Sequence, residues 1–319
     1  MNYEVLIQNG STVYQPSIVG TVQVTSERLL TPSKLTLDVY ADENLKVEEG
    51  NKVQLKVDGV PVFLGFIFTM KYDKDKISIT AYDQLRYLKN KDTKSYSNKR
   101  ADELIDMLAT EYNLTCGKLS NTGYKIASRV EDNTSLLDMI QNAIDLTTQA
   151  TGNLYIMYDD FGKITLSGLE DLIVPILIDE ETASSVSYKS SIDSSTYNKI
   201  KLIYEDSKTK AREVYIAQDS ASMGEWGTLQ YFEKIKNNVN GKAMADALLK
   251  LYNKKSRSLS ISGAFGDTRV RGGSLIAVQL NLGDVKLQNL MLVDKCTHKF
   301  SNDEHLMDLT LSGRGEFYA

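Results

Sequence analysis

Cysteine is scarce in this sequence, in which 319 residues include only Cys116 and Cys296. Two cysteines are too few to build a disulfide scaffold in a chain of this length, so we expect reduced thiols and synthesis in a cytoplasm. The first residues lack the basic start and the apolar run of a secretory signal. No stretch approaches the roughly 20 apolar residues that a membrane helix needs, so we expect no membrane insertion by this chain.

Excess positive charge is missing as well. The chain has 42 acidic and 37 basic residues, which give a formal net charge of −5. No global positive field is therefore available to hold nucleic acid, and we expect no specific nucleic-acid binding. A hydrophobic content of 42% and a charged content of 25% are ordinary for a folded protein with enough chain for two or more cores.

Apolar and polar side chains alternate through the first part of the chain. The alternating segments are Val22–Val24, Lys34–Val39, Lys52–Val57 and Lys76–Ala81. This period of two predicts half-buried strands, and short turn signals such as Asp58-Gly59 favour antiparallel pairing. We predict a first β-barrel domain over residues 1–90. The apolar run Pro61–Met70 predicts a strand buried on both faces, or one covered outside by a neighbouring subunit.

Residues 91–170 are predicted to form a small α/β module. The lysine-rich segment 86–100 indicates a solvated connector. Helical stripes follow at Leu104, Ile105, Leu108 and Tyr112, and then at Leu136, Leu137, Ile140, Ala143, Ile144 and Thr147. The expected N-caps are Ser97 or Asn98 for the first helix and Asn133 or Thr134 for the second, which should stop at Gly152. A hairpin of 154–158 and 163–166 closes the module.

Strand patterns return in the last third, which we predict to be a second β-barrel domain over residues 171–319. They cover 186–188, 199–204, 213–217, 258–262, 275–280, 289–299 and 305–312. One helix, at about 240–253, carries Met244, Ala247, Leu248, Leu251 and Tyr252 on one side and should cover an opening or a face of that barrel. The predicted fold class is β-rich α+β, with two antiparallel β-barrels around the α/β module.

The strongest candidate for a chemical site is the group Cys296, His298 and His305, which includes both histidines of the chain. On an extended strand Cys296 and His298 point to the same face, while His305 returns across a turn at 301–303. A metal site is geometrically possible, but a fourth ligand is missing. We favour a hydrogen-bonded hairpin end, and we expect no metal and no cofactor.

Other catalytic patterns are weaker. Cys116 follows a predicted helix in a loop, which is the wrong place for the nucleophile of a cysteine peptidase. A glycosidase needs two carboxylates held in a cleft. The acids that the sequence offers without pairing them are Glu131, Asp132, Asp179, Glu180 and Glu181. Asp160-Phe161-Gly162 mimics a kinase motif and 269–273 mimics an RNA-binding box, but both are more typical of turns. We predict no catalytic residue.

Three stretches together resemble one known family. The first consists of Glu49–Leu55, Phe63–Ile67 and Ile77–Asp83; the second runs from Asn133–Ile140 through Thr151–Tyr155; the third consists of Arg271–Ser274, the strand to Val293, His298–Phe300 and His305–Leu309. In this order they are similar to the opening barrel, the central helix and hairpin, and the closing hairpin of baseplate hub proteins of the XkdQ/YqbQ kind. The resemblance covers nearly the whole chain and depends on order and spacing.

The resemblance implies two tail-tube-like β-barrels per chain and a structural role as the baseplate hub of a phage tail or tail-like particle. A homotrimer of such chains would join the hexameric tail tube to the trimeric spike and form part of the central channel. The expected partners are the tail tube protein, the spike or central needle protein, and other baseplate (wedge) and LysM-type tail proteins. The expected location is the bacterial cytoplasm during assembly and then the particle's baseplate. An acidic chain would suit a lumen past which DNA slides.

Two other classes of function stay open. A tail-associated peptidoglycan hydrolase would need a cysteine–histidine pair or a carboxylate pair, and neither emerges from the pattern. A carbohydrate-binding adhesin would fit the β-rich pattern with its 18 tyrosines and one tryptophan, Trp226. Fibre-tip adhesins would carry trimeric fibre repeats, which this sequence lacks. We therefore favour a hub that is not an enzyme.

Overall fold

The computed structural model describes residues 1–193, 196–205, 210–235, 240–281, 286–301 and 304–313. Contacts group the chain into two units, one made of Met1–Val186 with Ser260–Leu311 and a second centred on Ser187–Leu259. This grouping does not test the division into three domains, which stays a prediction. Strands dominate and helices are few, so the β-rich α+β class is confirmed. No helix of the described ranges is long and apolar enough to cross a membrane.

The largest sheet contains 13 strands in the path β14-β18-β21-β20-β3-β4-β7-β6-β5-β1-β2, with β13 and β19 attached beside β20. Its strands are β1 (Tyr3–Asn9), β2 (Thr12–Tyr14), β3 (Ile18–Glu27), β4 (Thr31–Tyr40), β5 (Lys52–Val57), β6 (Val60–Tyr72), β7 (Lys76–Tyr82), β13 (Ile173–Ile178), β14 (Ser185–Ser191), β18 (Ser256–Phe265), β19 (Leu275–Asn281), β20 (Lys286–Ser301) and β21 (Glu304–Gly313). The strands predicted from alternation are confirmed.

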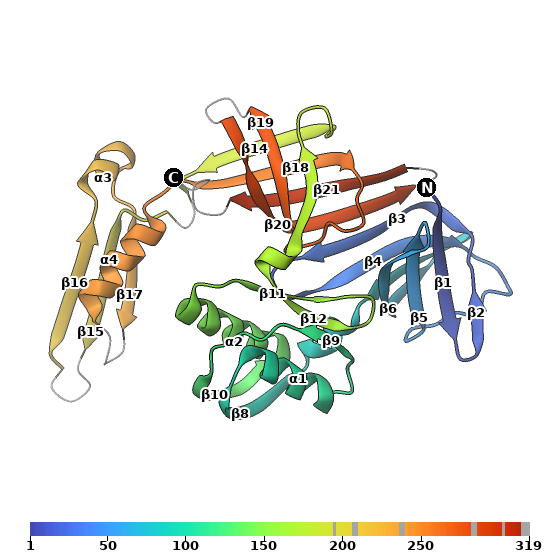
Figure 1. The fold of residues 1–319 in the computed structure, drawn as a ribbon, viewed down its shortest axis with the longest axis horizontal. Helices are drawn as coiled ribbons and strands as arrows, with labels where there is room; N and C mark the ends of the chain where they lie inside the picture. The colour runs from blue at the N-terminus through green and yellow to red at the C-terminus, as the bar shows by residue number, and fades with distance from the viewer. Residues whose placement is uncertain (194–195, 206–209, 236–239, 282–285, 302–303, 314–319) are drawn as a thin grey trace. The chain divides into compact units, whose positions relative to one another are not determined.

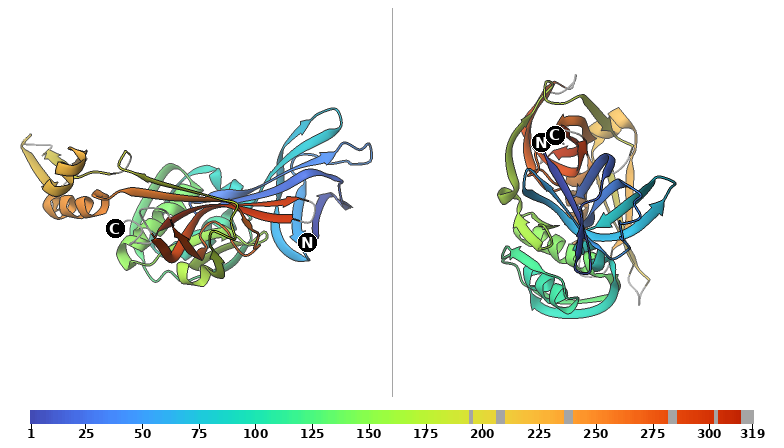
Figure 2. Two further views of the ribbon diagram at one scale, coloured as in Figure 1. Left: turned by 90° about the horizontal axis from the view of Figure 1, so that it is seen from above. Right: turned by 90° about the vertical axis from the view of Figure 1, so that its right-hand side faces the viewer.

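The long strand β20 joins the early and late strands into one sheet. Its first part pairs with β19 through Lys286–Leu292, and its second part pairs with β3 through Lys295–Phe300. Figures 1 and 2 show β20 and β3 running side by side. The prediction of two barrels is wrong for the described strands, which form open sheets without closure. Because β20 pairs with a late strand and with an early strand, the two segments share one sheet, and neither closes on itself.

The predicted helices and hairpin of residues 91–170 are present between η1 and η2. Its elements are η1 (Gln84–Lys89), β8 (Lys91–Lys99), α1 (Ala101–Glu111), β9 (Cys116–Leu119), β10 (Ile126–Ser135), α2 (Leu136–Thr151), β11 (Tyr155–Asp159), β12 (Ile164–Gly168) and η2 (Leu169–Leu172). The predicted stripes of both helices face a common core that includes Leu104, Leu108 and Ile140. The predicted hairpin is β11–β12, and β9 adds a parallel strand to it.

The helix starts differ from the predicted ones. Helix α1 begins after Arg100, whose backbone N–H donates to Glu103 Oε2 at 2.9 Å, because Asn98 still belongs to β8 and has a φ of 52°. Helix α2 begins after Ser135, whose Oγ accepts from the backbone N–H of Asp138 at 3.1 Å. The predicted stop at Gly152 is confirmed by its left-handed φ of 74°.

The lysine-rich segment is not a solvated connector. Most of it forms β8, which pairs antiparallel with β10 and buries Tyr96. Lys94 forms ion pairs with Asp92 and Glu111. Lys94 and Asp92 lie on the same face of β8 as the buried Tyr96 and contact helix α1, whereas the other lysines of the strand lie on its exposed face or near its end. The charge count alone does not separate this pattern from a loop.

Strand β6 is half-buried, so the prediction of burial on both faces is wrong. Phe63 and Ile67 lie in the core, while Phe66 and Phe68 on the other face remain partly exposed. Those two rings lie 5.7 Å from the ring of Tyr87 in η1, measured between centroids. The chain thus covers part of the outer face itself, through the short helix that follows β7.

The second unit contains a small sheet of its own, with the order β16-β15-β17. Its elements are β15 (Lys199–Glu205), β16 (Arg212–Gln218), α3 (Ser220–Trp226), β17 (Gln230–Ile235) and α4 (Gly241–Tyr252). Helix α4 lies along one face of this sheet, not on a barrel (Figure 1). Its packed stripe includes the predicted Met244, Leu248 and Tyr252 together with Ala245 and Leu249. The predicted Ala247 and Leu251 are exposed. The predicted and the observed stripes share their centre, and a period of 3.6 residues does not decide which neighbours at the edges of the stripe are buried.

Gly65 in β6 gives a test of the close packing between β6 and β7. A Cβ at Gly65 would press against the carbonyl oxygen of Tyr82 and lie 2.7 Å from Cζ of Phe63. Because a backbone carbonyl cannot yield, we expect Gly65→Ala to lower the free energy of unfolding by about 1–3 kcal/mol. Urea unfolding followed by circular dichroism measures it.

Gly168→Ala is the matched control for Gly65→Ala. A Cβ at Gly168 meets nothing within 4 Å, and the φ of −65° suits alanine. We expect a change within about 0.5 kcal/mol. Equal losses of stability in the two variants would contradict the close approach of β6 to β7.

Candidate functional site: a buried polar junction

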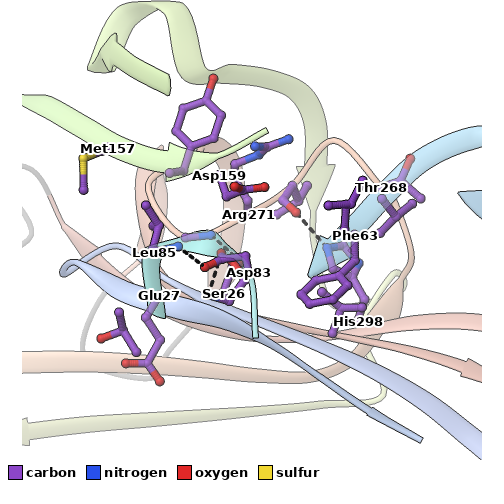
Figure 3. A pocket seen from close by; sticks show the side chains of 18 residues that line it. Ser26, Glu27, Phe63, Asp83, Leu85, Met157, Asp159, Thr268, Arg271 and His298 are labelled. Atoms are coloured by element: carbon purple, nitrogen blue, oxygen red, sulfur yellow. Dashed lines mark hydrogen bonds between the residues drawn. The ribbon is translucent and has the colours of Figure 1, made fainter. Parts of the chain in front are cut away.

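A small cavity of about 50 Å³ lies where four parts of the first unit meet. Its lining includes Ser26 of β3, Asp83 between β7 and η1, Asp159 at the end of β11, and Arg271 before β19 (Figure 3). Val270, next to Arg271, also lines it. A volume of this size holds a few water molecules, whereas sites for organic ligands span about 300–1,000 Å³. The cavity therefore does not fit a sugar or peptide substrate.

Asp83 is the most buried acid of this junction, with 1% of its surface exposed. It caps η1 by accepting from the backbone N–H of Leu85 at 3.0 Å, and its second oxygen accepts from the N–H of Ser33 at 2.8 Å. Burial, together with the nearby charge of Asp159, raises the pKa of Asp83 to about 8. The carboxyl group is therefore largely protonated at neutral pH.

Asp159 is the second acid of the junction. Its Oδ1 accepts from the backbone N–H of Gly162 at 2.6 Å, and its Oδ2 accepts from Nε2 of Gln84 at 2.9 Å. Burial raises its pKa, although these two hydrogen bonds oppose the rise. Gln84 also exchanges hydrogen bonds with the backbone of Thr115, at 3.0 and 3.1 Å. The side chain of Gln84 thus ties the end of β7 to both β9 and the β11–β12 turn.

The loop before β19 closes the junction from another side. The guanidinium of Arg271 lies 4.4 Å from the ring centroid of Tyr158, a cation–π contact, and the backbone N–H of Gly272 donates to Ser26 Oγ at 2.9 Å. A Cβ at Gly272 would lie 2.6 Å from the backbone nitrogen of Arg28. Gly273 has a φ of 96°. The prediction of a turn for this glycine pair is confirmed, and the glycines allow the turn to dock against β3.

The two histidines form a buried hydrogen-bonded chain. His298 Nε2 lies 2.7 Å from the carbonyl oxygen of Val270, so this nitrogen carries the proton and donates it. His298 Nδ1 then accepts from His305 Nε2 at 2.9 Å, and Cys296 Sγ lies 3.4 Å from His298 Nε2. Burial and the neighbouring His305 lower the pKa of His298 to about 4. Both nitrogens of His298 are engaged, which is the arrangement expected of a hairpin end.

The remaining residues considered for chemistry lie apart from this junction and are engaged in local contacts. Glu131 pairs with Arg129 at 2.8 Å and accepts from Asn142 at 3.2 Å. Asp132 accepts from Thr93, Glu180 accepts from the N–H of Asn281, and Asp179 accepts from the N–H groups of Glu181 and Thr182. Cys116 lies in the short strand β9 instead of a loop, and burial raises the pKa of its thiol.

The kinase-like tripeptide and Cys296 are the last of the groups considered for chemistry. Phe161 and Gly162 form the β11–β12 turn with φ values of 49° and 83°, as predicted. Burial also raises the pKa of the Cys296 thiol. Within the described ranges, no group of three or more histidine, cysteine, aspartate or glutamate side chains is placed to hold a metal ion.

The acid pair of the junction was missed by the sequence analysis. Asp83 follows an alternating strand and precedes a helical turn, a position that favours an N-cap. That signal could have marked Asp83 as a local cap. Its partner Asp159 lies 76 positions further along the chain, inside what reads as an ordinary hairpin turn. No local pattern links the two.

An exposed apolar row lies on the part of the sheet where β13 pairs with β19. Leu177 of β13 lies opposite Ala277 of β19, which in turn lies opposite Leu290 of β20. Leu177 and Leu290 keep 48% and 40% of their surface exposed, and Ile173 of β13 keeps 48%. Of the described strands, only β19 pairs with β13. An apolar row beside an open strand edge is typical of a surface that contacts another protein.

The fold as a whole occurs in known tail proteins. The 43 kDa tail protein of prophage MuSo2 from Shewanella oneidensis superposes with a TM-score of 0.70 at 12% identity, and the match covers 99% of this chain and 100% of that one. The E. coli c3393 protein, described as a type VI secretion component with structural similarity to the T4 tail proteins gp27 and gp5, superposes with a TM-score of 0.62 at 9% identity, covering 99% and 78%. This chain therefore has the fold of these tail proteins.

Sequence similarity then gives the family. The YQBQ-like family matches residues 22–312, and the chain belongs to this family. It is 31% identical over 303 residues to the uncharacterized protein YqbQ of Bacillus subtilis strain 168, covering 92% of this chain and 91% of that protein. It is 29% identical over 269 residues to the phage-like element PBSX protein XkdQ of the same strain, covering 82% and 81%. The family resemblance found in the sequence is confirmed.

The stability contributions of Asp83 and His298 change with pH in opposite directions. Because the folded pKa of Asp83 is raised from 3.8 to about 8, its contribution to stability is complete below pH 3.8 and is lost as the pH rises through about 8. Because the folded pKa of His298 is lowered from 6.5 to about 4, its contribution is complete above pH 6.5 and is lost as the pH falls through about 4. Between pH 6.5 and 8, Asp83 is the one of these two that titrates.

We expect the free energy of unfolding to fall by about 1.5 kcal/mol between pH 6.5 and 8, because the folded protein still holds the Asp83 proton over most of this range and the unfolded protein does not. Asp83→Asn removes the titrating group and should flatten this slope, even though it loses one accepted hydrogen bond and starts from a lower stability. Urea unfolding at several pH values measures both slopes. The burial of Asp83 would be refuted by a wild-type protein whose stability does not change across this range.

Proposed function

We propose that this chain is the structural hub of the baseplate of a phage tail or phage-tail-like particle. In this role it joins the hexameric tail tube to the trimeric spike as a homotrimer and forms part of the central channel. The observation that carries the proposal is the match to the YQBQ-like family over residues 22–312, together with a tail-protein fold over 99% of the chain.

The open sheet supports a role in assembly. Strands β2 and β14 lie at the two ends of the strand path, and β13 pairs only with β19 among the described strands. Free edges and the apolar row of Leu177, Ala277 and Leu290 are features that neighbouring subunits cover in an oligomer. An isolated copy would leave these groups in water. We therefore propose that further copies and the tail tube protein cover them, and that the spike or needle, wedge and LysM-type proteins bind elsewhere.

We also propose that the protein acts without catalysis. The acids considered for a hydrolase are engaged in ion pairs and turns, and His298 uses both of its ring nitrogens. The buried acid pair Asp83 and Asp159 faces a cavity of about 50 Å³, which has no room for a glycan. The contribution of the chain is then the geometry of its contacts.

The number of copies in a particle tests the proposed function. We expect a tagged chain, expressed in its own host after prophage induction, to sediment with the particles at about three copies per tail, as a threefold hub requires. Quantitative mass spectrometry against the tube and sheath subunits measures this number. A chain that stays in the supernatant, or that is present in many copies along the tube, would overturn the proposal.

A further inference from the structure

The small sheet of the second unit has one covered face and one open face. Helix α4 covers the face that carries Ile200, Leu202 and Ala217, all of them buried. Because side chains alternate along a strand, the neighbouring residues of β15, β16 and β17 point to the opposite face. No described helix or strand packs on that face as α4 does on the first.

The open face has an apolar centre. Its central row is Ile216 of β16, Lys201 of β15 and Phe232 of β17, which lie opposite one another across the sheet. The next row is Val214, Ile203 and Lys234. Val214, Ile216 and Phe232 keep 49%, 54% and 51% of their surface exposed. Large apolar side chains exposed side by side on a flat sheet usually mark a contact surface.

The same face is positively charged. The described residues of the three strands place four cations and one acid on it, and we call this surface the basic face. Its charged members are Lys199, Lys201, Arg212, Lys234 and Glu205. Glu205 is already paired with Arg212 at 2.9 Å, while Lys199, Lys201 and Lys234 form no ion pair with the described residues. Within the part of the chain that the structure describes, three cations of this face are therefore uncompensated, although the formal net charge of the chain is −5.

The other described acids of the three strands lie on the opposite face. Glu233 lies on the α4 side and accepts from the Tyr231 hydroxyl at 2.7 Å. Glu213 lies on the same side and accepts from the Tyr215 hydroxyl. This alternation places Glu213 and Glu233 on the α4 side and leaves Glu205, which is paired with Arg212, as the one acid that the described residues place on the basic face. The positive charge of the basic face therefore follows from the alternation of side chains along β15, β16 and β17 and from the way these strands are paired.

We propose that the basic face of the second unit docks an acidic surface of another protein, with carboxylates against Lys199, Lys201 and Lys234 and apolar side chains against Ile216 and Phe232. Charge complementarity selects such a partner and speeds its encounter, while the apolar centre supplies the contact area. The inference goes beyond the proposed function and does not depend on it, since it rests on the second unit alone.

A protein surface fits this face better than a nucleic acid does. A phosphodiester backbone would be attracted by the lysines, but it would bring charged phosphates against Val214, Ile216 and Phe232, which offer no hydrogen bonds. The basic face measures roughly 23 by 10 Å from strand rise and spacing. A face of these dimensions is smaller than the about 800 Å² that each partner buries in a stable interface. The basic face is then the anchor of a larger contact.

Photo-crosslinking in induced host cells tests the inference. A benzophenone amino acid replaces Phe232 in the full chain, and the same amino acid at Leu251 serves as the control. Leu251 is exposed to 52%, close to the 51% of Phe232, but it lies on the outer side of α4. We expect position 232, and not position 251, to crosslink to another protein through a peptide rich in aspartate and glutamate, identified by mass spectrometry.

A charge variant makes the electrostatic part of the inference testable. Lys201→Glu in the crosslinking background should lower the yield at position 232 about tenfold, since it places a like charge opposite the acidic partner. Lys242→Glu, on helix α4, carries the same charge change and should leave the yield unchanged. Circular dichroism and urea unfolding confirm that both variants are folded.

Four results would overturn the inference. They are no crosslink at position 232, equal crosslinking at 232 and 251, a product that nuclease removes, and a product with a second copy of this chain or with a basic peptide. Because the crosslink forms in cells before any fractionation, it does not require the chain to sediment with particles. A crosslink to an acidic partner without sedimentation would refute the proposed hub and keep the docking surface.

Discussion

The pairing of β20 with two different strands is the contact on which the first unit depends. Its first part completes the sheet of the late strands, and its second part adds Phe300 to the core formed by the first seven strands. Neither segment has its full sheet without it. Because the backbone hydrogen bonds of a strand are satisfied only by neighbours, β20 fixes both segments in one register. The loop at Gly272 and Gly273 then docks on β3 next to this pairing.

The buried acids of the junction are a cost that the fold carries. A carboxyl group can be buried at low cost only when it is neutral or well hydrogen-bonded. Asp83 and Asp159 each accept two hydrogen bonds, and burial favours the neutral form of both. In return, Gln84 and the two carboxyl groups hold β7, β9 and the β11–β12 turn together by directional bonds. An apolar contact of equal size would allow these elements to slide. The junction thus exchanges some stability for a defined geometry between the sheet and the α/β module.

Local patterns predicted most elements, and the order of three resembling stretches predicted the family. The alternation of β5 and the stripes of α1 and α2 identify their elements because each is decided by neighbours within a few residues. Closure of the sheet was predicted wrongly, since the partner of β3 lies in β20, near the other end of the chain. Asp83 and Asp159 were missed for the same reason. Contacts between distant segments leave no periodic trace in one sequence.

The position of β20 also has a consequence for synthesis. Thr25 of β3 and Thr297 of β20 are neighbours in the sheet but are 272 residues apart in the chain. At a translation rate of about 5–20 residues per second, the free edge of β3 waits roughly 15–55 s for its partner. An unpaired strand edge during that time is a template for aggregation. This chain therefore completes its large sheet only after nearly all of it has been synthesised.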